Sequence, residues 1–442
     1  MWRSYSPGLT TQRYWRSIHH RRDDAYIGPL EFPNPPAAVS PALGRYDVFA
    51  LGRIPGIFSG PLTLEHYTRR PFAEIDSRAA SQTGWRNLGV PERSFDGTRK
   101  RFRLEGKPGA ISYYDRSGKL CMLAFVRDSD RVLHIYRDCE PSRGWLSYDF
   151  YGGPFAPFES DPSVVAFVDW FGARRIWAFS ARSSPGGFGP GLVIFYSRFE
   201  LNFQRPHTEG LWRARGAEVY QDGPPSAITI ADDTGTQHII VFSVASELVF
   251  GRPTLFGRRY SLARGNDPAD LPPNPEVYFL GTMGVPGWPA RLQRAAPGVI
   301  AHREGSIILL SIFVLDESGV WMCSGRLSDV TDRRGSNTIP RGLLPNGWSW
   351  HSLPPAPSQY RLLRISGIAC RREQPISSED TGLRISIFCN AVRQTSSGLV
   401  PTTLLLSTTR RGSTFGSGID GTWTDLSSLP CVHIPVYRIS RT

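Results

Sequence analysis

Three side chains suited to binding alternate along the segment TLEHYTR, residues 63–69. Side chains of a β-strand point alternately to its two faces, so a strand here places Glu65, Tyr67 and Arg69 on one face. A carboxylate and a guanidinium form directed, paired hydrogen bonds, and an aromatic ring offers a flat apolar surface. This combination favours recognition of a bound molecule without a chemical reaction.

Motifs for covalent or metal chemistry are absent from the sequence. There is no GxSxG nucleophile elbow, no phosphate-binding P-loop and no HExxH zinc motif. The nine histidines show no metal-ligand spacing, and the six cysteines include no CxxC pair. We therefore expect no metal, no cofactor and buried free thiols. Pairing of Cys121 with Cys139, or of Cys370 with Cys389, is the alternative.

The cationic residues are almost all arginine. The chain has a formal net charge of +12, and its only lysines are Lys100, Lys107 and Lys119. Arginine suits anionic or hydroxyl-rich ligands, although codon bias in a GC-rich genome explains the same excess. No long basic block is present, so we expect no nucleic-acid partner, whereas the charge favours an acidic protein partner.

The sequence predicts a soluble cytoplasmic protein without membrane contact. Its first residues, MWRSYSPGLTTQRYWRS, lack the apolar run of a signal peptide. No segment approaches the ~20 consecutive apolar residues of a membrane-spanning helix. Unconventional export remains the alternative.

The strands that must position these residues belong to a repeat in the sequence. A tryptophan flanked by glycine or polar residues recurs at spacings of 60 to 76 residues. The copies are Trp15, Trp85, Trp145, Trp212, Trp288, Trp348 and Trp423. Short apolar segments separated by turn residues precede most copies, four to a repeat, as in a β-propeller. A tryptophan at the start of an outer strand favours packing between blades over ligand stacking.

The repeat predicts an all-β fold, a single β-propeller domain over residues 1–442 with four-stranded blades. We place the complete blades at residues 37–90, 109–153, 162–217, 225–290, 297–354 and 366–429. Seven blades are favoured, the last one split between closing strands in residues 1–20 and 432–442, because this closure removes the free sheet edges. Six blades with both termini as extra edge strands is the alternative.

The first module resembles a known family of propellers. The segments PPAAVSPALGRYDVFALGR, LEHY and GWRNLG are similar to the blades of fungal fucose-binding lectins and of bacterial Photorhabdus-type lectins. The resemblance is close over residues 33–90 and loose elsewhere. It implies ligand sites between adjacent blades, where arginine and glutamate bind sugar hydroxyls and an aromatic ring stacks on the sugar.

The resemblance carries ligand roles to particular positions. In the first module these are Glu65, Tyr67 and Arg69, with Trp85 nearby. The counterparts in later modules are Tyr136, Arg137, Tyr196, Arg198, Arg264, Arg326 and Arg410. No later module has a carboxylate matching Glu65, so the sequence predicts at most one or two sites that resemble the fucose pocket of the family. A solvated strand edge is the alternative for the later Tyr/Arg pairs.

Three functions are compatible with these observations. The favoured one is a carbohydrate-binding, fucose-type lectin-like propeller. The second is a cofactor-free enzyme of fungal specialised metabolism, resembling cyclisation catalysts of the hetero-Diels–Alder type, which would hold a small molecule in one apolar pocket. The third is a scaffold that binds a protein partner.

Overall fold

The structure is a computed structural model in which part of the chain is described. It describes residues 2–5, 14–17, 34–39, 46–53, 62–69, 84–95, 98–114, 118, 120–139, 142–146, 158–168, 174–182, 191–197, 212–219, 223–232, 234–245, 253–262, 276–279, 292–304, 307–317, 319–328, 347–372, 380–396, 398–411 and 419–425. Among them, no helix is long and apolar enough to cross a bilayer.

Within these ranges the chain forms six four-stranded antiparallel sheets, which we call blades 1 to 6. Blade 1 consists of β3 (Ala37–Val39), β4 (Tyr46–Gly52), β5 (Thr63–Arg69) and β6 (Gly84–Gly89). Blade 2 consists of β9 (Leu104–Tyr114), β10 (Leu120–Asp128), β11 (Leu133–Cys139) and β12 (Ser142–Leu146). Blade 3 consists of β13 (Ser163–Val168), β14 (Arg174–Arg182), β15 (Gly191–Ser197) and β16 (Trp212–Val219).

The second half of the chain repeats this arrangement. Blade 4 consists of β17 (Ser226–Ala231), β18 (Gln237–Ala245), β19 (Thr254–Leu262) and β20 (Glu276–Phe279). Blade 5 consists of β21 (Gly298–Glu304), β22 (Ile307–Asp316), β23 (Gly319–Arg326) and β24 (Ser349–Ser352). Blade 6 consists of β25 (Tyr360–Arg372), β26 (Asp380–Thr395), β27 (Gly398–Arg411) and β28 (Ile419–Asp425).

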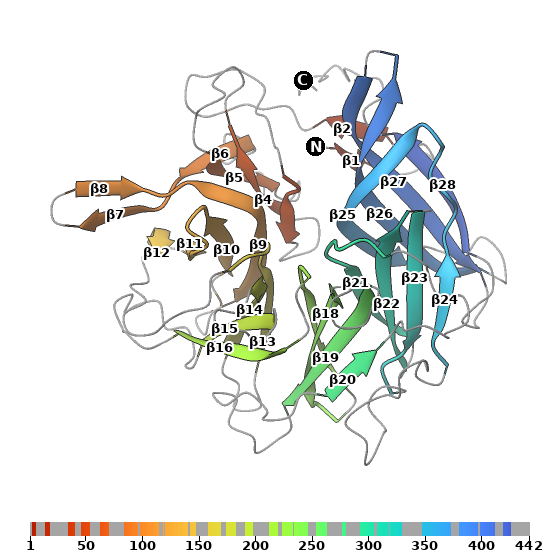
Figure 1. The fold of residues 1–442 in the computed structure, drawn as a ribbon. Coiled ribbons are helices and arrows are strands. Elements are labelled where there is room, and N and C mark those ends of the chain that lie inside the picture. The colour runs from red at the N-terminus through yellow and green to blue at the C-terminus, as the bar shows by residue number, and fades with distance from the viewer. Residues whose placement is uncertain are drawn as a thin grey trace, which may run out of the picture.

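The blades are arranged as a β-propeller (Figure 1). In each blade the strands pair in chain order, and the first strand contacts the first strand of the next blade, from β3 to β9 and onward to β25. The first strands therefore lie innermost around a common axis. The all-β propeller expected from the tryptophan repeat is confirmed.

Two further hairpins lie outside the six blades. Strands β1 (Trp2–Tyr5) and β2 (Tyr14–Ser17) pair with each other, as do β7 (Glu92–Phe95) and β8 (Thr98–Arg101). The expected closing strand at 432–442 lies outside the described residues, so the choice between seven and six blades stays a prediction.

Each pair of consecutive blades encloses an apolar cluster. Phe49 of blade 1 packs with Met122 of blade 2, and Trp177 of blade 3 packs with Tyr260 of blade 4. Strand β18 serves two clusters, because Ile239 and Val241 face blade 3 while Ile240 and Phe242 face blade 5. Apolar side chains on both faces are what a sheet packed between two others requires.

Recurrent tryptophans join neighbouring blades. Trp145 of blade 2 donates its indole hydrogen to the Leu88 carbonyl of blade 1 at 3.0 Å. Trp423 of blade 6 donates in the same way to the Pro354 carbonyl, next to blade 5, at 2.8 Å. A partly buried indole that bonds to the adjacent blade has a packing role, as expected for these two residues.

Three cysteine thiols have described side chains. Cys121, Cys323 and Cys389 are buried, Cys323 and Cys389 carry free thiols, and burial raises the pKa of Cys389 to about 12. The backbones of Cys121 and Cys139 lie opposite each other on β10 and β11. The side chains of Cys139 and Cys370, and all of Cys431, lie outside the described part of the chain.

Candidate functional site

The register of blade 1 places the predicted binding residues on one face of β5. Glu65 lies opposite Asn87 of β6, and Tyr67 lies opposite Trp85. Directly opposed residues of an antiparallel pair project from the same face, and residues two apart on a strand also share a face. Arg69, two residues beyond Tyr67, continues this face. We call the surface formed by Glu65, Tyr67, Arg69, Trp85 and Asn87 the β5 face.

The opposite face of blade 1 is covered by blade 2. His66 approaches Asp138 of blade 2, with 3.7 Å between Nδ1 and Oδ2. Leu64 belongs to the apolar cluster shared with blade 2. The β5 face is therefore turned away from blade 2.

The carboxylate of the β5 face is held in a fixed position. Glu65 is 0% exposed, and the Thr63 hydroxyl donates a hydrogen bond to its Oε1 at 2.8 Å. Tyr67 is partly exposed. The backbones of Arg69 and Trp85 are described, whereas their side chains lie outside the description. The face thus combines a buried, oriented acceptor with an accessible aromatic residue.

The later predicted residues differ in their surroundings. Tyr136 is 4% exposed and packs edge-on against Trp145 at 5.4 Å between ring centroids, and Arg137 is 6% exposed. Arg326 is exposed at the end of β23. For Tyr196 and Arg410 only the backbone is described, and Arg198 and Arg264 lie outside the described residues. Among the predicted residues that the structure describes, it therefore brings only the blade 1 set together on one face.

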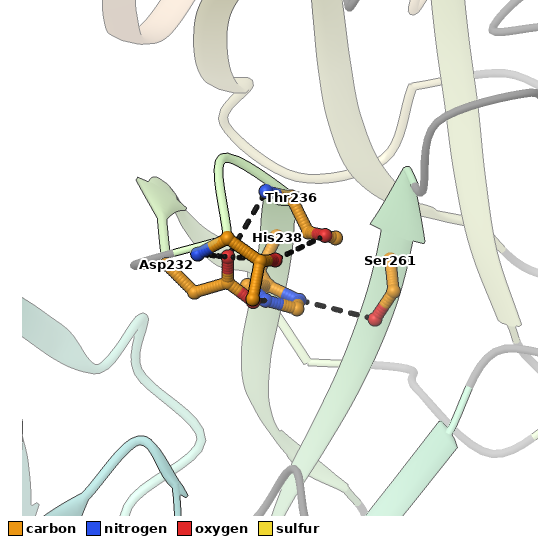
Figure 2. A network of polar contacts seen from close by, with 5 residues as sticks. Asp232, Thr236, His238 and Ser261 are labelled. Carbon is orange, nitrogen blue, oxygen red and sulfur yellow. Dashed lines mark hydrogen bonds and ion pairs between the residues drawn. The ribbon is translucent and has the colours of Figure 1, made fainter.

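A polar network in blade 4 has no counterpart in the sequence analysis. Asp232 accepts a hydrogen bond from His238, with 2.9 Å between Oδ2 and Nε2, and His238 Nδ1 lies 3.1 Å from the Ser261 hydroxyl (Figure 2). The other carboxylate oxygen accepts from the backbone amides of Thr234 and Thr236, each at 2.9 Å. Asp232 thus joins a hairpin turn to β18, and His238 continues the network to Ser261 of β19.

The order Asp–His–Ser matches a charge-relay triad, but its recurrence favours a structural role. In blade 2, Asp128 Oδ2 lies 2.7 Å from His134 Nε2, and Asp128 Oδ1 accepts from the Val132 amide. There His134 packs against the ring of Phe102 at 4.6 Å. In both blades the aspartate and the histidine are six residues apart across a hairpin turn, so the shared function is to stabilise the turn. That spacing is the sequence signal that could have revealed the pairs.

The Asp232–His238 pair in blade 4 is expected to contribute to stability at neutral pH but not in acid. Burial alone would raise the pKa of Asp232, but hydrogen bonds from Thr234, His238 and Thr236 outweigh it and hold the pKa below its usual value. A carboxyl with a lowered folded pKa stabilises the fold above its unfolded pKa. That contribution disappears as the pH falls through the folded pKa.

We expect Asp232→Ala to lower the free energy of unfolding by about 2 kcal/mol at neutral pH, because it removes charge-assisted hydrogen bonds. The difference from the unmodified protein should shrink once the pH falls below about 4. Urea denaturation at pH 7 and pH 3 measures both values, and the double variant with His238→Ala isolates the pair. Equal destabilisation at both pH values would contradict a role for the charge.

No potential metal site is seen within the described residues, where no group of three or more His, Cys, Asp or Glu side chains could hold an ion. His66 lies between two carboxylates. Its Nε2 is 3.0 Å from Asp47 Oδ1, and its Nδ1 is 3.7 Å from Asp138 Oδ2. Their arrangement fits a histidine held between two acceptors.

Comparison with known proteins gives no family. No protein-family model and no curated protein matches the chain. Among solved structures, AofleA from Arthrobotrys oligospora aligns with 10% identity over 90% of this chain and 88% of its own, with a TM-score of 0.43. The lectin of Aleuria aurantia, a six-bladed propeller that recognises fucose, aligns with 11% identity over 92% of this chain and 100% of its own, also with a TM-score of 0.43. The α-L-arabinanase of Penicillium chrysogenum aligns with 10% identity over 94% and 98%, again with a TM-score of 0.43. These similarities include a lectin and a glycoside-cleaving enzyme, and they do not assign a function.

Proposed function

We propose that this chain is a carbohydrate-binding propeller of the fucose-lectin-like type, with its site on the β5 face. The observation that carries the proposal is the shared face of Glu65 and Tyr67, opposite Asn87 and Trp85 in the strand register. A sugar presents hydroxyl groups at its edge and C–H groups on its ring face. The β5 face offers the matching groups, namely a carboxylate, an amide and aromatic rings.

The orientation of Glu65 supports this proposal. A binding group that is already fixed loses little conformational entropy when its ligand arrives. Because Thr63 holds the carboxylate and no part of Glu65 is exposed, it would orient the buried end of the site. In this proposal Tyr67 stacks on the sugar ring and Arg69 donates paired hydrogen bonds to its hydroxyl groups.

We further propose a single strong site. Tyr136 and Arg137, the blade 2 counterparts, are buried in the packing between blades. No carboxylate corresponds to Glu65 in the later blades. The side of blade 1 that carries the site faces the ring closure, where the split seventh blade predicted from the sequence would supply the second wall.

The proposal is tested by titrating the protein against immobilised α-L-fucosides and a wider glycan array. We expect saturable binding that free sugar competes away. Tyr67→Ala and Arg69→Ala should each weaken it by about tenfold or more, since each removes a stacking or charge-assisted contact.

Arg326→Ala is the matched control, because Arg326 is an exposed arginine on β23 of blade 5. Its affinity should remain unchanged. Absence of any sugar binding at physiological salt, or equal losses in the Arg326 and Arg69 variants, would refute the site.

A further inference from the structure

A second group of polar residues gathers where the innermost strands meet. We call it the axial cluster, and its members are Asn34, Glu105, Lys107, Arg127, Asp161, Arg364 and Ser366. Lys107 of β9 donates to the Ser366 carbonyl of β25 at 3.3 Å, and Arg364 of β25 donates to Asn34 Oδ1 at 3.4 Å. Since β3 lies beside β9, a side chain linking blade 2 to blade 6 must pass close to the centre of the ring.

A glycine allows the cluster to close around Lys107. Gly106 has a φ of 78°, and a Cβ atom at this position would collide with the Asp161 carboxylate. The same position lies 3.5 Å from Nη2 of Arg127. Glycine therefore lets a carboxylate and a guanidinium both approach the backbone next to Lys107.

The axial cluster carries more positive than negative charge. Its cations are Lys107, Arg127 and Arg364, and its anions are Asp161 and Glu105. Arg127 and Glu105 form an ion pair at 3.7 Å, and the negative charge of Asp161 acts on both Lys107 and Arg364. Within the described part of the chain, Nε of Arg127 is buried without a hydrogen-bond partner. A buried donor without a partner is costly, and an excess of positive charge around it favours an anion as that partner.

The pKa of Lys107 is lowered in this environment. Burial lowers the pKa of Lys107, Asp161 opposes that effect, and the positive charge of Arg364 adds to the lowering. The side chain is nevertheless partly exposed, so a small solute can reach it.

We propose that the axial cluster is a binding site for a small oxyanion, a carboxylate or a tetrahedral anion, held between Lys107 and Arg364. Lys107 offers a compact ammonium and Arg364 a planar set of donors, a common pair around oxyanions. The negative charge of Asp161 reduces the repulsion between the two cations. This site is separate from the β5 face and does not depend on sugar binding.

Binding at this site is coupled to the protonation of Lys107. An anion favours the charged form of a neighbouring lysine and so raises its pKa. The free site binds best while Lys107 is protonated, and affinity falls as the pH rises through its lowered pKa. In the described cluster, Asp161 and Arg364 are the charged groups that act on Lys107.

The test uses the three lysines of the chain as one another's controls. The intact protein is treated with limiting acetic anhydride across a pH series, and acetylation at Lys100, Lys107 and Lys119 is quantified by mass spectrometry. Lys107 should reach half-maximal reactivity at a lower pH than the other two. Sulfate or acetate should lower its reactivity about tenfold, the effect of raising its pKa by one unit, relative to chloride at equal ionic strength.

The two anions separate the ligand classes, since protection by sulfate points to a tetrahedral anion and protection by acetate to a carboxylate. Arg364→Met should weaken the protection about tenfold or more, whereas Arg361→Met, at an exposed arginine of the same strand, should leave it unchanged. Unchanged labelling of Lys107 with both anions would overturn the proposal. So would a Lys107 that is never labelled, because it would show that the cluster is closed to small solutes. Neither result bears on fucoside binding at the β5 face.

Discussion

Replacing Trp177 by alanine is expected to lower the free energy of unfolding by about 3 to 5 kcal/mol, the range for removing a large aromatic side chain from a core. Trp177 is 0% exposed on β14 and joins two blades. Its ring packs edge-on against Phe167 of blade 3 at 5.6 Å and Tyr260 of blade 4 at 5.7 Å. Phe179 adds a third ring at 6.1 Å.

The size of this effect follows from where the cavity would form. Alanine leaves a gap between two sheets, and the rings around it cannot close the gap without moving one blade relative to the other. Trp177→Phe retains part of the contact and should lose less stability. Val168→Ala is the control on blade 3, because Val168 is 45% exposed and its truncation should change stability by less than about 0.5 kcal/mol. Urea denaturation measures all three, and similar losses for Trp177→Ala and Val168→Ala would show that the interface between blades 3 and 4 is not tightly packed.

The architecture was predictable because the strands and turns of each blade depend on residues that are close together in the sequence. Inner strands begin at Ala37, Ser163, Ser226 and Gly298, the residues near which they were expected. The turn between β17 and β18 is also local, because Gly235 has a φ of 79° and its amide donates to the Asp232 carbonyl. Turn residues and β-branched runs act within a few positions, so the sequence alone reveals them.

Strand extensions that depend on the closed ring were not predictable. Strands β9 and β25 begin earlier than expected, at Leu104 and Tyr360. The early part of β9 reads LEGKPG, which has low strand propensity. Its residues are held by contacts with blade 6 and with Asp161, far away in the sequence. The hairpin of β7 and β8 was also missed, although Asp96–Gly97 between its strands is a recognised hairpin signal.

The candidate site was predictable in part for the same reason. Strand alternation places Glu65 and Tyr67 on one face, and the register with β6 agrees. The same pattern could not separate Tyr136 from Tyr67, because burial depends on which side of a blade a neighbour covers. The histidine–aspartate pairs join side chains across turns or strands. The axial cluster joins five parts of the chain, and only the fold brings its members together.

The buried pair Asp47–His66 leads to the second large effect, which links stability to the proposed site. Asp47 Oδ1 lies 3.0 Å from His66 Nε2, and the imidazole stacks on Phe49 with 4.4 Å between ring centroids. Its other nitrogen faces Asp138 of blade 2. His66 lies between Glu65 and Tyr67 in the strand and points to the opposite side, so it fixes the backbone that carries both.

Asp47→Ala is expected to cost about 3 kcal/mol, because it leaves a buried imidazole without its main acceptor. Asp47→Asn keeps an acceptor oxygen at this position and should cost about 1 kcal/mol. Urea denaturation measures these losses, and a double-mutant cycle with His66→Ala assigns them to the pair.

The same variants show whether a loss of fucoside binding comes from a changed geometry of the β5 face or from a loss of folded protein. At a temperature where both variants remain folded, Asp47→Ala should weaken fucoside binding several-fold although Asp47 lies on β4 and on the face turned toward blade 2. Asp47→Asn should restore most of the affinity, whereas Trp177→Phe, which is destabilised in blade 3, should bind normally. If Asp47→Ala binds fucoside as tightly as the unmodified protein, the packing of blade 1 on blade 2 does not set the geometry of the β5 face. In that case the site would depend only on the strands that carry it.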